Sequence, residues 1–307
     1  MDFSLIIDTL IEGVYLPFNY IIDPKKRIHF IYLFSSCVLA LWVYFRRNTK
    51  GSFFKFIFSK KIWFSKSAFI DYSFVFFNAF VKVVVLAPIF TFGLLLALYT
   101  KKLLVGFFDQ PSFLLNEIES IIIYTVTIFL INDFSSFLVH YFMHKIPLLW
   151  RFHKIHHSAT TLNPVTQYRI HPVELIINNF RGLFVNSITT GVFIYFSENP
   201  VYLITFFGVN ILTFVFLFYG SNLRHSHVKL VYWNWLESII ISPYQHQIHH
   251  SNKPIHFNKN LGSKLAIWDW LFGTLVKSKS AQKIIFGLGE EDQIYDTFFK
   301  NLITPFS

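Results

Sequence analysis

The chain has 307 residues and is unusually apolar, with 53% hydrophobic and only 14% charged residues, whereas soluble domains carry roughly 25% charged residues. Together with a mean hydropathy of +0.46, this composition favours an integral membrane protein over an apolar soluble helical protein. The net charge of +10 does not indicate nucleic-acid binding, because the basic residues lie mainly beside apolar segments, as they do in the cytoplasmic flanks of membrane spans.

The first apolar segment, residues 3–22, is interrupted by Asp8, Glu12 and Pro17. Charged residues and a proline within a segment of this length favour a helix that lies along the membrane surface over one that crosses the bilayer. We therefore expect an interfacial helix at this end of the chain.

Three later segments are long and apolar enough to cross a bilayer. These predicted spans are residues 28–45, a segment within 70–99, and about 121–142. Two shorter apolar stretches, 182–196 and 200–220, flank the turn sequence Ser-Glu-Asn-Pro and predict a hairpin. The expected fold class is all-α, a multi-span integral membrane helical bundle.

The basic residues predict the orientation of these spans. Seven Lys and Arg lie within 46–66, against two directly after residue 99, which places the 46–66 loop in the cytoplasm. Counted forward, the third span ends on the cytoplasmic side near His140, and the hairpin at 182–220 leaves and returns on that side. The histidine motifs are thus expected to form one cytoplasmic cap on the helical bundle.

Ten of the thirteen histidines lie in three short windows. The windows read H-x-x-x-H, then H-x-x-H-H, then H-x-H followed by a second H-x-x-H-H. An i, i+4 spacing places two imidazoles on one helical face, and adjacent residues diverge by about 100°, so each triplet can straddle two metal ions. The ten are His140 and His144; His153, His156 and His157; and His225, His227, His246, His249 and His250.

The ligand type favours iron. Imidazole suits zinc, copper, iron and nickel, and the only cysteine, Cys37, excludes a cysteine-based site. A structural zinc ion binds four ligands and leaves no open position, so two zinc ions would not need this many histidines. Iron accepts five or six ligands and can keep one position open for O2. The Glu-x-x-His pattern of soluble di-iron bundles is missing from the sequence.

At these residues the chain resembles the fatty acid hydroxylase/sterol desaturase superfamily. The resemblance runs from Asp133 through the first triplet, then through Ser242-Pro-Tyr-Gln-His246 and the second triplet, and on to Asn260-Leu-Gly and Trp268-Asp-Trp-Leu-Phe-Gly-Thr274. It covers roughly residues 120–275. The resemblance implies a membrane enzyme that binds two iron ions through these histidines and uses O2 and electrons to hydroxylate or desaturate a lipid.

Carried over residue by residue, the resemblance implies nine metal ligands. Four further residues are candidates for additional ligands or for partners that orient the ligands: His227, His171, His256 and Asp133. Asp133 precedes His140 by two helical turns and is expected to accept an imidazole N–H. Trp268 and Trp270 are interpreted as interfacial anchors. The nine expected ligands are His140, His144, His153, His156, His157, His225, His246, His249 and His250.

The whole chain is interpreted as one membrane domain. Residues 1–118 are expected to hold the interfacial helix and the first two spans, 119–275 the di-iron catalytic region, and 276–307 a C-terminal tail. No cytochrome-b5-like or flavin-binding segment is visible in the sequence. We therefore expect electrons from a separate redox partner, such as a cytochrome-b5-like protein, a ferredoxin or a flavin reductase.

Several functions remain open at this stage. Within the superfamily, the chain could be an alkylglycerol-type ether-lipid monooxygenase, a fatty-acyl or sphingolipid hydroxylase, a sterol-type desaturase or a carotenoid hydroxylase. A divalent-metal transporter is a distant alternative, because its ionisable residues would lie near the bilayer midplane and not at one end. A metalloprotease would need H-E-x-x-H, but Tyr, Lys and Gln follow His140, His153 and His246.

Overall fold

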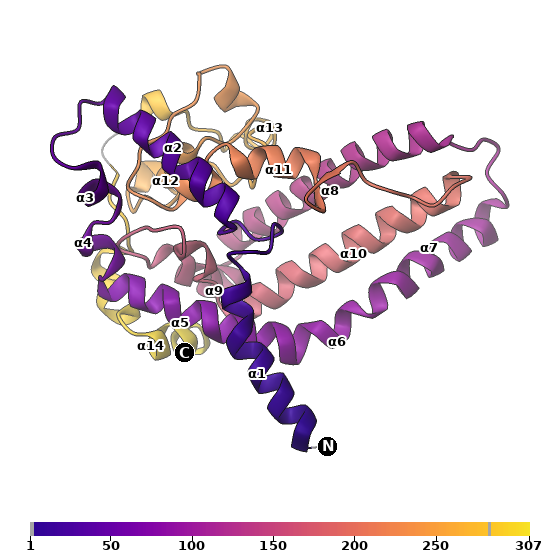
Figure 1. Ribbon diagram of the computed structural model, residues 1–307, viewed down its shortest axis with the longest axis horizontal. Coiled ribbons are helices and arrows are strands. Elements are labelled where there is room, and N and C mark those ends of the chain that lie inside the picture. Colours follow the sequence, from indigo (N-terminus) through magenta and orange to yellow (C-terminus); the bar gives the residue numbers. More distant parts are fainter. Residues whose placement is uncertain (1–2, 282–283) are drawn as a thin grey trace.

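The computed structural model describes residues 3–281 and 284–307, and for residues 3–8 and 10 the backbone alone. The Asp8 side chain, which contributes to the prediction of an interfacial helix, therefore lies outside the described part. Almost all regular structure is helical, which confirms the expected all-α class (Figure 1). The only strands of the described residues are the two-residue β1 (Thr205–Phe206) and β2 (Val209–Asn210).

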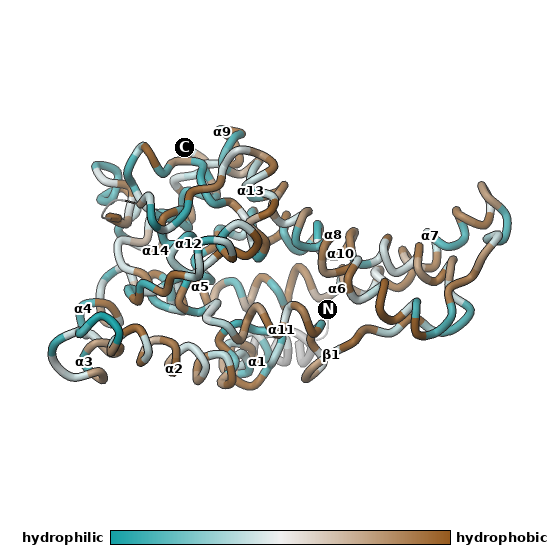
Figure 2. The backbone as a smooth tube through the Cα atoms, turned by 90° about the horizontal axis from the view of Figure 1, so that it is seen from above, coloured by the Kyte–Doolittle hydropathy of each residue, from teal (hydrophilic) through white to brown (hydrophobic). Residues whose placement is uncertain are grey.

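The helices form a body and an elongated arm (Figure 1). In the arm, α10 packs against both α7 and α8, and apolar residues run along all three helices (Figure 2). Many of their large apolar side chains are exposed, among them Phe107 and Ile118. An exposed apolar surface of this extent marks an interaction with a membrane or a partner. The arm consists of α7 (Phe92–Phe108), α8 (Glu117–Lys145) and α10 (Pro172–Phe196).

Two helical segments of the described residues are long and apolar enough to cross a membrane, judged by length and composition. They are Lys66–Phe108, with 43 residues, and Glu117–Lys145, with 29 residues. The span expected at 28–45 corresponds to α2 (Phe30–Arg46), an apolar helix of 17 residues that is shorter than these two. The third expected span, 121–142, lies within α8.

The second expected span, within 70–99, is not one straight helix. Its residues belong to α5 (Lys66–Val81), a π-helical turn at Lys82–Leu86, α6 (Ala87–Phe90) and the start of α7. The π turn widens the helix and Pro88 lacks a backbone N–H, and both features bend helices. As a result α5 lies in the body while α7 lies in the arm (Figure 1).

The N-terminal segment forms α1 (Phe3–Asn19), which confirms the helix expected within 3–22. α1 packs against α5 and the π turn, and directly after it Tyr20 stacks on Tyr168 with 5.4 Å between ring centroids. The basic 46–66 segment contains two short helices, α3 (Phe53–Ile57) and α4 (Lys60–Trp63).

The hairpin expected at 182–220 is only half helical. Its first limb, α10, begins ten residues earlier, at Pro172. The returning limb is extended and turns at Phe207 and Gly208, whose φ angles of 51° and 70° give a two-residue β-hairpin turn. Thr125 of α8 binds this limb, accepting from Ile204 N at 2.9 Å and from Asn210 Nδ2 at its carbonyl oxygen. These two hydrogen bonds attach the limb to α8, and helical structure resumes at α11 (Ile211–Phe218).

Short helices of the body carry the histidine triplets and close the structure around them. Beyond residue 275, the side chains of Tyr295 and Phe298 pack against Ile70, Phe74 and Ile155, so the C-terminal segment covers α5 and α9. These short helices are α9 (Pro147–His157), α12 (Pro243–His249), α13 (Ile267–Leu271) and α14 (Phe298–Ile303).

Candidate metal centre

The nine expected ligands fall into two groups in the body. Within each group, one possible ligand atom from each side chain lies within 4.8 Å of all the others. Rings of different groups are also neighbours, since the centroids of His157 and His250 are 4.7 Å apart. The five-histidine cluster contains His140, His144, His153, His157 and His249, and the four-histidine cluster contains His156, His225, His246 and His250.

The two H-x-x-H-H triplets are divided between the clusters. α9 gives His153 and His157 to the five-histidine cluster and His156 to the four-histidine cluster. The second triplet, which ends α12, gives His249 to the first and His246 and His250 to the second. Side chains separated by three or four residues share a helical face, and an adjacent one points elsewhere. The local helix geometry therefore distributes each triplet over two sites.

Each triplet helix has a strong start. α9 begins with Pro147 at its first position, and α12 begins with Pro243 after Ser242. The Ser242 side chain accepts from Gln245 N, while the Gln245 side chain accepts from Ser242 N, which is a capping box. The proline start of α9 and the capping box of α12 fix where the two short helices begin, and the histidines lie in their last turns.

The ring nitrogens within each cluster are very close to one another. His153 Nε2 lies 3.1 Å from His140 Nε2 and 3.3 Å from His157 Nε2. In the four-histidine cluster, His225 Nε2 lies 3.2 Å from His156 Nε2 and 3.1 Å from His250 Nε2. Nitrogen atoms converge in this way when they surround a shared cation.

Hydrogen bonds on the far side of several rings determine which nitrogen faces the cluster. The Nδ1 atoms of His140, His249 and His156 lie 2.7, 3.0 and 3.2 Å from the carbonyl oxygens of Leu261, Lys259 and Arg169. A carbonyl oxygen can only accept, so each Nδ1 carries the proton and each Nε2 presents a lone pair to its cluster. This is the tautomer that binds a metal.

Burial keeps these rings neutral. Desolvation lowers the pKa of His153 and of His156 to about 3, and it lowers the pKa of His225 and His250 as well. The Nε2 atoms of His144 and His249 are buried and have no hydrogen-bond partner. A metal ion in the five-histidine cluster would satisfy these two lone pairs. The converging imidazole nitrogens of both clusters fit one metal ion each.

His246 differs from the other members. The guanidinium of Arg224 donates from Nη2 to His246 Nδ1 at 2.8 Å, so this nitrogen accepts instead of donating. Arg224 also donates to the carbonyl oxygens of Gly262 and Ser263. Burial first, and then the nearby charge of Arg27, lower the pKa of Arg224 to about 9.

Glu174 is a further residue of the site that sequence reasoning missed. Its Oε1 accepts from His153 Nδ1 at 3.0 Å, and both side chains are buried. Glu174 stands in the first turn of α10, 21 residues after its partner. In the sequence, Glu174 is visible only as an acidic residue at the start of a long apolar helix. Acidic residues are common at that position because they stabilise the helix N-terminus, so the sequence alone did not indicate a role in the site.

The Asn260-Leu-Gly and Trp-Asp-Trp segments together position the carbonyl group that binds His140. Asp269 accepts from the backbone N–H groups of Leu261 and Gly262, both at 2.7 Å, which holds the Leu261 carbonyl against His140. A side chain at Gly262 would meet Asp269 Oδ2 at 2.7 Å, so the loop requires glycine. The roles of Asp269 and of this carbonyl were also missed, because neither is visible in the spacing of the histidines.

Asp133 does not orient an imidazole, contrary to expectation. Its Oδ2 accepts from Leu265 N at 2.9 Å and from Trp268 Nε1 at 3.0 Å, and Lys264 Nζ lies 3.6 Å from Oδ1. No imidazole contact is found among the described residues. Asp133 therefore ties α8 to the loop that carries the Leu261 carbonyl, and Trp268 is part of that link as well as a possible interfacial side chain.

The three remaining candidate histidines lie outside both clusters. His171 caps α10, accepting at Nδ1 from Val173 N at 3.1 Å. The His227 ring packs edge-on against Phe56 with 4.7 Å between centroids. His256 is buried in the short 3-10 turn Pro254–His256.

Two cavities reach the clusters. The first, of about 310 Å³, is lined by five of the clustered histidines and by residues of α8 and α10. The second, of about 350 Å³, is lined by the other four, together with Trp150, Phe257 and Glu291. Each cavity touches both clusters, so the two histidine groups separate one cavity from the other. The five histidines of the first cavity are His140, His153, His156, His225 and His246.

Comparison with known proteins identifies the region that holds these clusters. Residues 125–274 match the Fatty acid hydroxylase family model. The chain is 26% identical to alkylglycerol monooxygenase of Xenopus tropicalis, over 55% of this chain and 34% of that protein. It is 27% identical to the ornithine lipid hydroxylase OlsE of Rhizobium tropici, over 58% of this chain and 48% of that protein.

Human cholesterol 25-hydroxylase is 32% identical, over 48% of this chain and 48% of that protein. The chain thus spans less than half of the length of each of these relatives, and no solved structure matches it. The resemblance seen in the sequence is confirmed. The region from residue 125 to residue 274, which matches the Fatty acid hydroxylase family model, contains every histidine of both clusters.

Proposed function

We propose that this protein is an integral membrane di-iron enzyme that uses O2 to hydroxylate a C–H bond of a lipid. The observation that carries this proposal is the pair of adjoining histidine clusters, each with its ligand atoms within 4.8 Å, inside the Fatty acid hydroxylase region. The names of the three relatives given above are all of hydroxylases or monooxygenases, which favours hydroxylation over desaturation.

The residues of the chain have separate roles in this proposal. Bound iron would supply the activation of O2 that attack on an unactivated C–H bond requires. The nine clustered imidazoles hold the metal ions, while Glu174 and the carbonyls of Leu261, Lys259 and Arg169 orient the rings. Burial of the clusters keeps bulk water from the reaction, and electrons come from a separate redox partner.

The exposed apolar arm supports a membrane location. Its large apolar side chains would be costly to leave in water, at about 25 cal/mol per Å², and hydrocarbon removes this cost. Along the arm, exposed apolar residues include Leu94, Leu95, Phe107 and Phe108 of α7, Ile118 and Ile122 of α8, and Phe184 and Ile188 of α10.

A contact within the body supports the cytoplasmic side for the clusters. Phe56, within the basic 46–66 segment, packs against Leu223 and Val228, which flank His225. The basic segment and the four-histidine cluster therefore lie at the same end of the molecule. Since Lys and Arg concentrate in cytoplasmic loops, we propose that both clusters face the cytoplasm.

Metal analysis of the purified protein tests the proposal. We expect two iron ions per chain and, in lipid extracts of cells that express the protein, a product that is heavier by one oxygen. One tightly bound zinc ion without iron would overturn the oxygenase assignment, and a product lighter by two hydrogens would replace hydroxylation by desaturation.

A pair of neighbouring histidines provides a matched control. His225→Ala removes a member of the four-histidine cluster, whereas His227→Ala removes a histidine two residues away that lies outside both clusters. We expect the first variant to lose iron and activity and the second to keep both. Equal loss in the two variants would mean that the clusters are not the metal site.

A further inference from the structure

The first cavity connects the clusters to a group of cationic side chains. Lys25, Lys26 and Arg27 belong to the turn between α1 and α2, and Lys82 begins the π-helical turn. Lys25 is exposed and Lys26 and Arg27 are half-buried, whereas the histidines of the four-histidine cluster are buried. The cationic residues therefore line the outer end of the cavity, which we call its mouth.

The charge at this mouth is not balanced within the described residues. Five cationic side chains line the cavity, the four of the mouth and Arg224, against one carboxylate, Glu174, which is bound to His153. Lys26 has a single acidic partner, Asp23, at 3.7 Å. Arg27 and Lys82 form no ion pair with a described carboxylate.

Lys82 is held in place by aromatic residues. Its Nζ donates to Tyr20 Oη at 3.2 Å and lies 5.1 Å from the centre of the Tyr20 ring. Lys26 Nζ lies 5.2 Å from the same ring, so two ammonium groups share one aromatic neighbour. Both groups are positively charged, and an anion bound beside them would offset their mutual repulsion.

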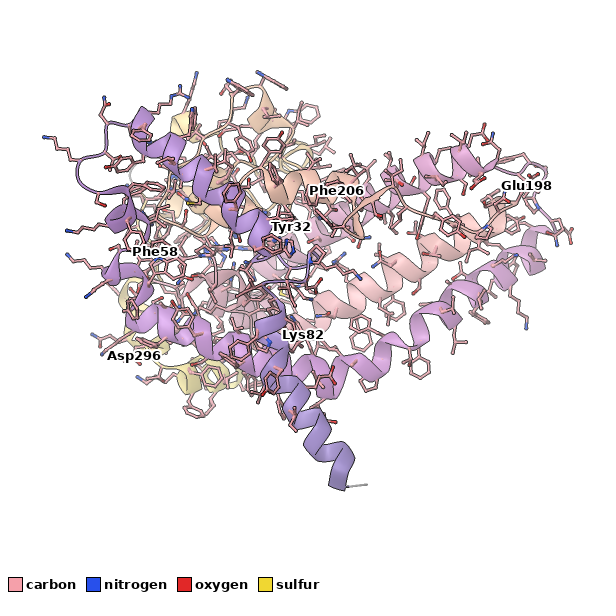
Figure 3. The ribbon with its side chains drawn as sticks, viewed as in Figure 1. Tyr32, Phe58, Lys82, Glu198, Phe206 and Asp296 are labelled. Atoms are coloured by element: carbon pink, nitrogen blue, oxygen red, sulfur yellow. The ribbon has the colours of Figure 1, made fainter. Side chains whose placement is uncertain are left out.

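The fold brings these cations together from distant parts of the chain. Lys82 stands at the start of the π-helical turn, a local distortion that often occurs at functional sites. α1 packs against this turn, and Figure 3 shows Lys82 where α1 crosses the bend between α5 and α6. The turn that follows α1 then places Lys25 and Arg27 at the same cavity.

The inner walls of the cavity are apolar in part. Val139 and Met143 come from α8, and Leu175 comes from α10. Both helices continue from the body into the arm (Figure 1). A hydrocarbon chain in the cavity can therefore follow these two helices toward the bilayer while a polar head stays at the mouth.

We propose that this cavity binds a lipid with an anionic head, a phosphate or a carboxylate, through Arg27 and Lys82 with Lys25 and Lys26. Arginine matches the geometry of either anion with two parallel hydrogen bonds, and lysine adds a point charge. Because the cations and the histidines line one cavity, the oxidised carbon lies near the head and not at the far end of the chain. This regiochemistry rests on the proposed hydroxylase function, whereas the binding preference does not.

Binding in uncharged detergent tests the preference directly. Three ligands with the same palmitoyl chain are compared: lysophosphatidic acid, palmitate and monopalmitoylglycerol. A hydrogen bond to a charged group contributes more binding free energy than a neutral one. We therefore expect each anionic lipid to bind at least roughly tenfold more tightly than the uncharged lipid. The tighter of the two anions identifies the head as phosphate or carboxylate, and equal binding of all three would overturn the proposal.

Two double variants test whether the cationic residues of the mouth cause the preference for anionic lipids. The double variant Arg27→Gln/Lys82→Gln should lose it, whereas Lys60→Gln/Lys61→Gln, which removes the same charge from two exposed lysines away from the cavity, should keep it. If the first double variant fails to fold in a thermal unfolding assay, Arg27→Lys/Lys82→Arg keeps both charges and should retain the preference. An unchanged preference in a folded glutamine variant would overturn the assignment.

Failure of this inference is distinguishable from failure of the proposed function. Lipid binding is measured on the protein as purified, without added reductant. A preference for anionic lipids in a protein that contains no iron and forms no oxidised product would support the lipid site and contradict the hydroxylase function. Conversely, the iron-loaded variant Arg27→Gln/Lys82→Gln could oxidise an uncharged lipid as well as the unchanged enzyme does. That result would contradict the lipid-head site and leave the hydroxylase function in place. A hydroxyl group at the far end of the chain would contradict the proposed regiochemistry.

Discussion

The five-histidine and four-histidine clusters use the same side chain but differ in the groups that lie behind the rings. In the five-histidine cluster, His140 and His249 donate to carbonyls of the 259–261 loop and His153 donates to Glu174. All of these outer partners are acceptors. Acceptors increase the electron density of the ring and favour metal binding through the opposite nitrogen.

The four-histidine cluster has one acceptor and one donor behind its rings. His156 donates to the Arg169 carbonyl, whereas His246 accepts from Arg224. An imidazole that accepts at Nδ1 carries its proton on Nε2, and it must lose that proton before Nε2 can bind a metal ion, so His246 is the weaker ligand. If each cluster holds a metal ion, as proposed above, identical ligands build two sites of different strength. We then expect the four-histidine cluster to lose its metal first during chelation.

The largest effect should come from removing one ligand of either cluster. His153→Ala and His156→Ala change residues three positions apart on α9 that belong to different clusters. Each variant should lose one of two metal ions, and activity should fall by more than the roughly 10–100-fold typical of an outer partner. Metal analysis and product formation measure this, and loss of both ions from each variant would show that the two sites are interdependent.

Glu174→Gln should have the next largest effect. The substitution keeps the shape of the side chain but removes the charge that His153 faces, and loss of an outer partner typically costs roughly 10–100-fold in metal affinity or activity. The effect should be confined to the five-histidine cluster. Competition with a chelator measures it, and equal weakening of both sites would contradict the local role assigned to Glu174.

Arg224→Met tests the donor behind the other cluster. The substitution frees His246 Nδ1 but leaves the carbonyls of Gly262 and Ser263 without a partner, at a cost of about 1–3 kcal/mol in the free energy of unfolding. In protein that remains folded, the four-histidine cluster should change its metal affinity while the five-histidine cluster does not. Sequential metal release during chelation reports the two sites separately.

Asp133→Asn should have the smallest effect on the metals. It weakens the bonds to Leu265 N and Trp268 Nε1, and we expect a loss of about 1–3 kcal/mol in stability with both metal ions retained. Thermal unfolding and metal analysis check this pair of results. A selective loss of metal without destabilisation would restore the role in orienting a ligand that the sequence suggested.

The sequence predicted those features that depend on neighbours along the chain. The length and apolar composition of the segments identified the residues that became α2, α5, α7 and α8. The spacing within H-x-x-H-H was sufficient to expect that each triplet serves two sites, because 3.6 residues per turn places His153 and His157 on one face and His156 on another. The type of ligand and the family followed from the same residues.

Only the tertiary structure decided which groups lie behind the ligands. Glu174 is 21 residues from His153, and Asp133 is 132 residues from Leu265. Contacts over such separations depend on the path of the chain, which hydrophobic periodicity does not encode. The extended limb after α10 illustrates this, since Thr125 of α8 accepts from the backbone N–H of Ile204 and from the side chain of Asn210, 79 and 85 residues away. The cationic mouth likewise exists only because α1 packs across the bend at Lys82.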